Sequence, residues 1–151
     1  MHSVTRRSFL GAAASTLALQ ARTLKTIGVQ LYTLRSILPQ KPLEILKELD
    51  QIGYREAEVI GASLDAIWPS LTQTKLKPVS VHLDTALFTT NQAKLPAALD
   101  DAKKRGIEYA VCPYIAPKDR GGVDVITKLA ETLNHAGEKC NASGMKLCYH
   151  N

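Results

Sequence analysis

Three side chains of this sequence have the types and spacing that acid–base chemistry on a small polar molecule requires. They are Glu58, His82 and His150. A carboxylate and two imidazoles can take up, hold and return protons under mild conditions. Each stands near the end of a short apolar stretch, and burying such a group unpaired in a core would be costly. We therefore predict that Glu58, His82 and His150 are the catalytic residues of one site.

Four further polar residues follow similar apolar stretches and are predicted to bind the substrate: Gln30, Tyr32, Tyr114 and Asn151. Their hydroxyl and amide groups can donate and accept hydrogen bonds. Structural interpretations stand beside these functional ones. Glu58 could pair with a nearby lysine or arginine, and His82 could be a hydrogen-bonded core histidine.

The elements that would position these side chains alternate between two hydrophobic periods. Stretches of period two predict five strands, at 26–33, 54–60, 78–83, 107–114 and 145–150. Stretches of period near 3.6 predict helices over 42–52, 95–105 and 124–141, and Ser63 is predicted to cap a short helix that Pro69 limits. Strand–helix alternation of this kind predicts a parallel sheet with right-handed crossovers.

The fold class that we predict is α/β, a partial (β/α)8 TIM barrel of about five parallel strands and four helices. A full barrel typically takes about 250 residues, so residues 22–151 would form its N-terminal half and the chain would be a fragment of a longer protein. A complete five-stranded doubly wound domain is the alternative. Against it, the sequence has neither a G-x-G-x-x-G motif nor a Walker A loop after any predicted strand.

Alternation along each strand predicts which side chains face the inside of such a barrel. The predicted inward sets are Gln30 and Tyr32; Glu56 and Glu58; Ser80, His82 and Asp84; Ala110, Cys112 and Tyr114; and Lys146, Cys148 and His150. The carboxyl ends of barrel strands form the mouth where active sites lie. We therefore expect six of the candidate residues to converge there: Gln30, Tyr32, Glu58, His82, Tyr114 and His150.

Residues 1–21 are expected to be a targeting signal rather than part of the folded domain. They contain no acidic residue and place Arg6-Arg7 before a short apolar run, which resembles a twin-arginine export signal cut after Ala21. An amphipathic N-terminal helix is the alternative. Export would make the protein periplasmic or secreted.

The composition excludes several classes of protein and of binding partner. The 151 residues are 45% hydrophobic and 22% charged, which is typical of a globular domain and excludes disordered or collagen-like chains. A formal charge of +5, without a basic run interleaved with aromatic residues, predicts no nucleic-acid partner, and no membrane association is expected after signal removal. Three cysteines are too few for a disulfide scaffold. A further alternative is a Cys/His metal site formed by His82, Cys112, Cys148 and His150.

Taken in order, the motifs resemble the xylose-isomerase-like TIM-barrel superfamily, also called the sugar phosphate isomerase/epimerase group. The residues that carry the resemblance are 27–34 (IGVQLYTL), 54–58 (YREAE), 80–83 (SVHL) and 146–151 (KLCYHN). The resemblance implies a metal-dependent isomerase or epimerase that acts on a sugar or sugar derivative through an enediolate-type intermediate. Its small-molecule partner would be a carbohydrate.

The resemblance also implies a divalent metal ion, held by two glutamates, an aspartate and a histidine from the fifth to eighth strands. That set is absent from the sequence, so no residue here is predicted to be a metal ligand and the 151-residue chain alone is expected to be inactive. Residues 112–114 (CPY) depart from the related DNA-repair branch, which has a histidine there. There are two alternatives. One is a glycoside-cleaving lyase on the same scaffold. The other is a non-catalytic sugar-binding or assembly half-barrel that self-associates through open sheet edges.

Overall fold

The computed structural model describes residues 25–150, so the predicted export signal at 1–21 and the predicted substrate ligand Asn151 lie outside the described residues. The strands form one parallel sheet in the order β1-β2-β3-β4-β5, each pairing with the next along the chain. They are β1 (Gly28–Gln30), β2 (Glu56–Ile60), β3 (Lys77–His82), β4 (Tyr109–Cys112) and β5 (Lys146–Tyr149). A doubly wound sheet reverses its strand order at a switch point, whereas a barrel does not. The sequential order therefore excludes the doubly wound alternative.

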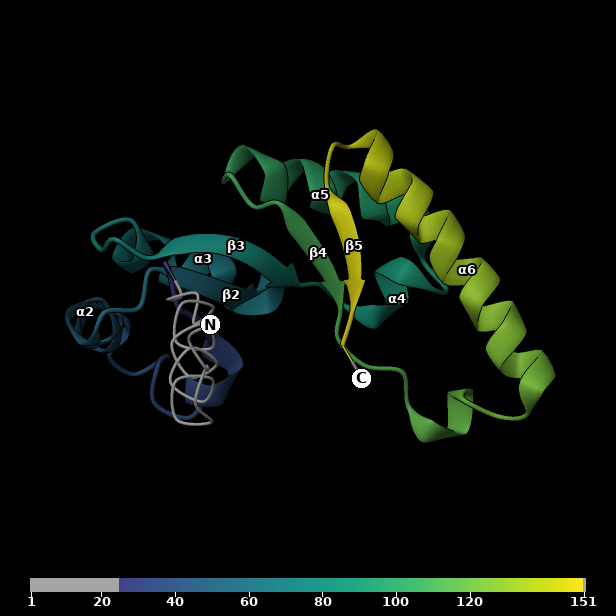
Figure 1. Cartoon of the computed structure of the whole chain (residues 1–151), viewed down its shortest axis with the longest axis horizontal. Coiled ribbons are helices and arrows are strands. Elements are labelled where there is room, and N and C mark those ends of the chain that lie inside the picture. Colours follow the sequence, from purple (N-terminus) through teal and green to yellow (C-terminus); the bar gives the residue numbers. More distant parts are fainter. Residues whose placement is uncertain (1–24, 151) are drawn as a thin grey trace, which may run out of the picture.

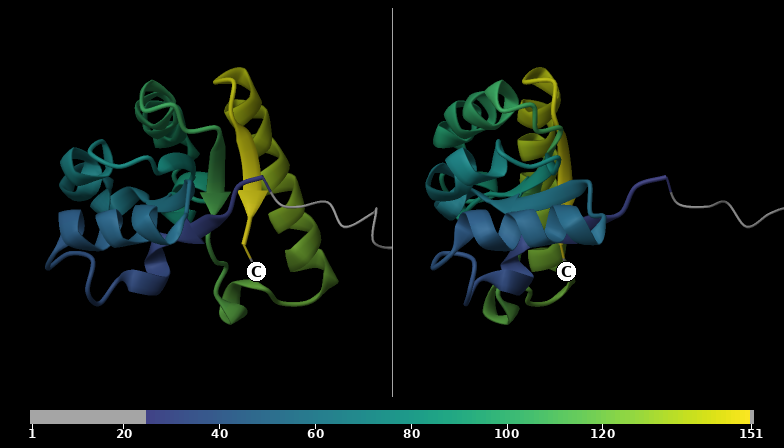
Figure 2. Two further views of the ribbon diagram at one scale, coloured as in Figure 1. Left: turned by 60° about the vertical axis from the view of Figure 1, so that its left-hand side comes forward. Right: turned by 90° about the vertical axis from the view of Figure 1, so that its left-hand side faces the viewer.

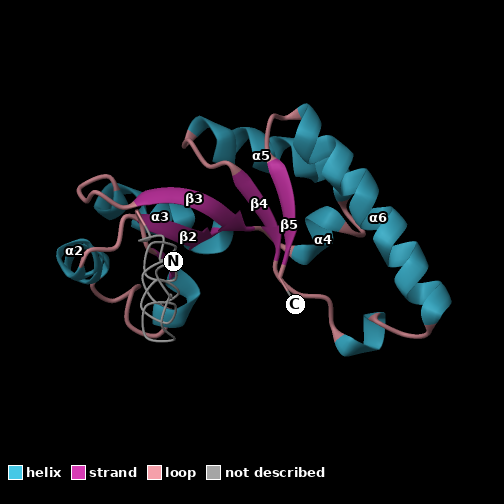
Figure 3. Ribbon diagram, in the orientation of Figure 1, coloured by secondary structure: helices cyan, strands magenta, loops and turns pink. Residues whose placement is uncertain are grey.

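Helices connect the strands and lie along the outer side of the sheet as an arc (Figures 1 and 3). They are α2 (Pro42–Ile52), α3 (Gly61–Leu71), α4 (Thr85–Phe88), α5 (Leu95–Lys104) and α6 (Val123–Ala142), with short 3-10 turns at η1 (Leu31–Leu34), η2 (Gln92–Lys94) and η3 (Pro117–Asp119). Figure 2 shows that the strands curve inside this arc. The predicted class, a partial (β/α)8 barrel, is confirmed.

The core lies between the sheet and the helices. On the sheet side, Ala57, Val59 and Val81 are fully buried, and the helices cover them with apolar side chains such as Leu46 of α2 and Leu99 of α5. Alternate strand residues point to opposite sides, so the residues between these core positions face the inside of the arc. That inner face is where the polar strand residues gather.

The first strand and the helix after β2 are among the elements that differ from the prediction. The first strand ends at Gln30 rather than residue 33, because η1 follows at once and turns Leu31 and Leu34 towards the core at the three-residue spacing of a 3-10 helix. Helix α3 begins at Gly61 without a Ser63 cap and continues past Pro69. Its buried stripe of Leu64, Ile67 and Leu71 outweighs the hydrogen bond that the proline removes.

Helix α4 was not predicted and matters for the site, because only Leu83 and Asp84 separate it from the end of β3. The Asp84 carboxylate caps it, since Oδ1 accepts a hydrogen bond from the backbone N–H of Ala86 at 2.9 Å. Across residues 25–150, none of the helices combines the length and the apolar character needed to cross a bilayer.

Candidate functional site

The centre of the candidate site is a row of three polar side chains across neighbouring strands. Gln30 of β1 is in register with Glu58 of β2, and Glu58 with Ser80 of β3. A bulge between Ala57 and Glu58 brings Ser80 into register with the glutamate. In-register residues of parallel strands point to the same face, so all three side chains meet on the inner side of the sheet.

The Glu58 carboxylate is held by three donors. Gln30 Nε2 donates to Oε1 at 2.5 Å, Ser80 Oγ donates to Oε2 at 2.8 Å, and His82 Nε2 lies 2.8 Å from Oε1. Burial raises the pKa of this carboxyl, but the hydrogen bonds from Gln30 and Ser80, together with the charge and hydrogen bond of His82, outweigh it and lower the pKa below its ordinary value. Glu58 is therefore an ionised and fixed acceptor, only 25% exposed.

This contact also fixes His82. Because Nε2 faces a carboxylate oxygen, that nitrogen carries the proton, and Nδ1 is the acceptor whenever the ring is neutral. Gln30 Nε2 lies 3.4 Å from His82 Nε2, so both donors converge on the same carboxylate oxygen. The His150 ring meets the His82 ring edge-on, with centroids 5.5 Å apart at 76°. Two imidazoles thus stand side by side above one carboxylate.

A cavity of about 390 Å³ opens beside Gln30 and His82, within the size range of small-molecule sites. Five of the seven predicted site residues line it, with Pro113: Gln30, Tyr32, His82, Tyr114 and His150. Glu58 does not line the cavity, but its carboxylate contacts two side chains that do, Gln30 and His82. The structure thus brings six of the seven candidates together at the carboxyl ends of the strands, and the seventh, Asn151, lies outside the described residues.

Two of the residues that line the cavity do not belong to strands, so strand alternation does not explain their position. Tyr32 belongs to η1, and Tyr114 lies beyond the end of β4; both are 51% exposed. Arginine side chains lie over their rings, Arg35 at 4.5 Å from Tyr32 and Arg120 at 5.6 Å from Tyr114. Both phenols therefore stand at the rim of the cavity.

The predicted inward set of the fourth strand is wrong. His82 is in register with Val111, so Val111 faces the inside, whereas Ala110 and Cys112 are fully buried in the core on the helix side. The pattern was misleading because all three residues are buried, and burial alone does not distinguish the two faces. Tyr114 still reaches the cavity, although strand alternation would place it on the helix side, because the chain leaves the strand before Pro113.

Ser80 and Pro113 are site residues that sequence reasoning did not select. Ser80 is the one buried polar residue among the described positions, and its signal was its place two residues before His82 on the same strand face. No sequence signal marks Pro113, whose role is to form cavity wall.

The alternative of a Cys/His metal site is not supported. Cys112 lies in the core, on the opposite face from His82, so the four residues do not converge. Residues 25–150 contain no group of three or more histidine, cysteine or acidic side chains that could hold a metal ion. The residues present therefore do not fit the divalent ion that the resemblance implies.

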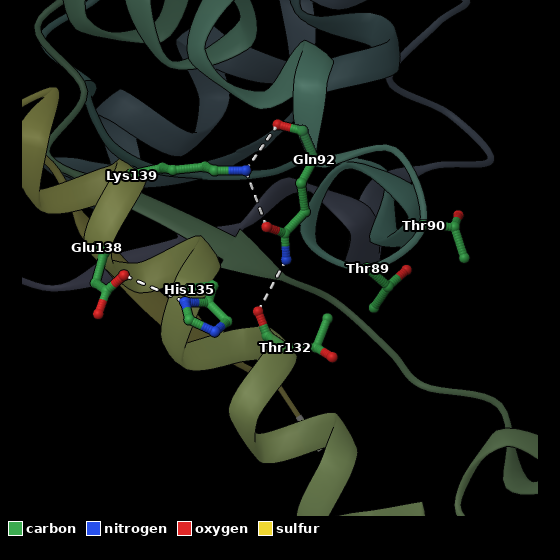
Figure 4. Close-up of a pocket in the computed structure, with 7 residues that line it drawn as sticks. All are labelled: Thr89, Thr90, Gln92, Thr132, His135, Glu138 and Lys139. Atoms are coloured by element: carbon green, nitrogen blue, oxygen red, sulfur yellow. Dashed lines mark hydrogen bonds and ion pairs between the residues drawn. The ribbon is translucent and has the colours of Figure 1, made fainter.

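A separate polar cavity of about 530 Å³ lies on the outer flank, between the α4–η2 segment and α6 (Figure 4). Gln92 crosses it: Nε2 donates to the carbonyls of Phe88 and Thr132, both at 2.8 Å, and Oε1 accepts from Lys139 Nζ at 3.0 Å. These bonds join α4 to α6, so we assign this cluster a structural role.

No family model matches this chain, and no curated protein matches it significantly. Among solved structures it is similar to a sugar phosphate isomerase/epimerase from Parabacteroides distasonis, with a TM-score of 0.67 and 24% identity over 87% of this chain and 53% of that one. It is also similar to the IolI protein, solved with a binding zinc atom, with a TM-score of 0.63 and 15% identity over 82% of this chain and 50% of that one.

A third similar structure is a xylose isomerase domain protein from Alicyclobacillus acidocaldarius, with a TM-score of 0.53 and 17% identity over 71% of this chain and 44% of that one. The chain spans about half the length of these proteins. The class that fold and comparisons define is thus a TIM-barrel-type α/β scaffold, represented here by five strands. At these identities the likeness establishes the fold, and activity has to be argued from the site.

Proposed function

We propose that the cavity over Gln30, Glu58 and His82 binds a sugar or sugar derivative, and that this chain contributes that cavity to a sugar isomerase or epimerase. The observation that carries the proposal is the convergence of an amide, two imidazoles and two phenols on one cavity at the carboxyl ends of the strands, with an ionised carboxylate holding the amide and one imidazole from behind. Such a lining offers both donors and acceptors to a molecule rich in hydroxyl groups. The names of the similar structures, which include a sugar phosphate isomerase/epimerase, support this substrate class.

The proposed roles follow from the hydrogen bonds. Glu58 holds Gln30 and His82 in fixed orientations, so it is a positioning residue for the lining above it. A neutral His82 ring presents Nδ1 as an acceptor for a substrate hydroxyl or proton. The exposed phenols of Tyr32 and Tyr114 bind hydroxyl groups at the rim. A preset hydrogen-bonding array of this kind orients a sugar without reorganising on binding.

Isomerisation or epimerisation requires that a proton leave the carbon next to a carbonyl group and return to the same or a neighbouring carbon. Within residues 25–150, His82 and His150 are the groups best placed to carry it.

The test is solvent-proton exchange in the intact protein. Incubation in D2O with a panel of aldoses, ketoses and their phosphates should place deuterium on the carbon beside the carbonyl of the substrate, detected by proton NMR. His82→Asn should slow the exchange by about 100-fold, a typical contribution of a general acid or base.

Glu58→Gln should raise KM and lower kcat, because it replaces an acceptor of three hydrogen bonds by a group that also donates. Glu108→Gln is the matched control: that carboxylate pairs with Lys77 on the exposed surface, away from the cavity. Sugar binding without exchange would favour the non-catalytic alternative, and release of the substituent of a glycoside would favour the lyase. No sugar binding at all would refute the proposal.

A further inference from the structure

A second cavity, of about 480 Å³, adjoins the polar one and differs from it in chemistry. Its own walls are mostly aliphatic: Ile60 at the end of β2, Ala62 in the first turn of α3, and Leu83 and Leu87 around the start of α4. The carboxylate in its lining, Asp84, is already engaged as the cap of α4. Burial of apolar surface is therefore the interaction that this cavity offers.

The two cavities adjoin and share part of their lining. Tyr32, His82 and Pro113 line both of them, so the His82 ring stands at the junction between the polar and the aliphatic parts. A molecule whose sugar ring contacts His82 would place a substituent of that ring against the aliphatic walls.

The aliphatic wall is built into the fold. Helix α3 starts directly after β2, with no intervening loop, so Gly61 and Ala62 are held over the end of β3. A Cβ at position 61 would lie 3.1 Å from the His82 carbonyl oxygen and 3.1 Å from Leu83 Cδ2. Glycine therefore permits the close approach that forms this wall.

We propose that this second cavity is a subsite for an apolar substituent, so that the substrate is a sugar that carries an aryl or alkyl group and keeps the carbonyl that proton exchange requires. Glycosides, which lack that carbonyl, serve as unreacting binding probes. The inference rests on the proposed function and names its substrate class. A phosphate substituent is disfavoured because no lysine or arginine is among the residues lining this cavity.

The experiment compares matched pairs of probes by calorimetry on the intact protein: methyl and phenyl β-D-glucoside, and methyl and phenyl β-D-xyloside. The phenyl compound of at least one pair should bind about tenfold more tightly, as expected for burial of one face of an aromatic ring. Ala62→Phe should fill the subsite from an exposed helix position, reduce that preference to under about twofold, and leave binding of the methyl glycoside unchanged. Ala66→Phe, the same change at an exposed position of α3 outside the lining, should keep the preference.

Phenol alone, observed by NMR, separates the two proposals. Phenol binding that Ala62→Phe abolishes, without any sugar binding, would support the apolar subsite and refute the proposed function. Equal affinities for the methyl and phenyl members of both pairs would refute the subsite and leave the sugar site standing. No binding of sugar, glycoside or phenol would overturn both.

Discussion

Nε2 of His82 lies 2.8 Å from Oε1 of Glu58, and both side chains are largely removed from solvent, at 11% and 25% exposed. The pair links β2 to β3 on the inner face of the sheet. The carboxylate also accepts hydrogen bonds from Gln30 and Ser80, so its charge is solvated by protein groups in place of water. The stability of this part of the sheet should therefore depend on the ionisation of Glu58.

The first prediction concerns acid sensitivity. The pKa of Glu58 is lower in the folded protein than its ordinary value of 4.5, so the unfolded state binds the proton at a higher pH than the folded state does. The stabilisation from this ionised carboxylate is present above pH 4.5 and is lost as pH falls through the folded pKa. Urea unfolding from pH 7 to pH 3 should show a smaller loss of stability in Glu58→Gln than in the parent protein.

Glu108 provides the comparison for this effect. Its pKa is also lowered, by the hydrogen bond and charge of Lys77, but this pair is exposed at the opposite ends of the strands. Salt screens exposed charges, with a Debye length of about 3 Å at 1 M. The pH-dependent contribution of Glu58 should persist in 1 M NaCl and that of Glu108 should vanish; equal loss of both would contradict the buried hydrogen-bonded state of Glu58.

The second prediction concerns Ser80, which donates to Glu58 Oε2 at 2.8 Å and is 8% exposed. Ser80→Ala should lower the free energy of unfolding by about 1–3 kcal/mol, because a charged acceptor loses a buried donor. Ser80→Thr retains the hydroxyl and should recover part of the loss. Ser36→Ala, at an exposed position, should change stability by less than about 0.5 kcal/mol in the same denaturant titration.

Much of this site follows from alternation along the strands, and its failures have identifiable causes. The sequence predicted that Gln30, Glu58 and His82 face the inside, because an apolar residue stands on each side of every one of them. In β4, residues 110–112 are all buried, so no alternation of polar and apolar residues shows which of them faces the inside. The inward-facing residue was therefore assigned wrongly.

Irregular backbone was the other obstacle. The bulge that brings Ser80 opposite Glu58 and the 3-10 turn that carries Tyr32 depend on packing between elements distant in sequence. The local sequence pattern does not predict packing of this kind. The positions at which the chain leaves a strand were therefore less predictable than the strands themselves.

The third prediction concerns the bridge between α4 and α6. Replacing Gln92 by alanine removes two hydrogen bonds donated to the carbonyls of Phe88 and Thr132 and one accepted from Lys139. Gln92→Ala should cost about 1–2 kcal/mol of unfolding free energy and should increase amide exchange in α4. Gln40→Ala removes a single exposed bond to the Ser36 carbonyl and should cost less than about 0.5 kcal/mol. If Gln92→Ala were as mild as its control, the cluster would be free for another role.

The fourth prediction uses one substitution at two glycines. At Gly61 a Cβ would meet the His82 carbonyl oxygen and Leu83 Cδ2, each at 3.1 Å, so Gly61→Ala forces α3 away from the end of β3 and should destabilise the protein by about 1–2 kcal/mol. At Gly137, inside α6, the nearest atom is Leu147 Cδ2 at 3.8 Å, an ordinary contact. Gly137→Ala should therefore stabilise by about 0.5–1 kcal/mol, the difference in helix propensity. Because Gly61 adjoins His82, its variant should also shift the His82 ring resonances in NMR spectra, whereas Gly137→Ala should leave them in place. A Gly61→Ala protein with unchanged stability and unchanged His82 resonances would show that the wall between the aliphatic cavity and His82 is less tightly packed than these distances require.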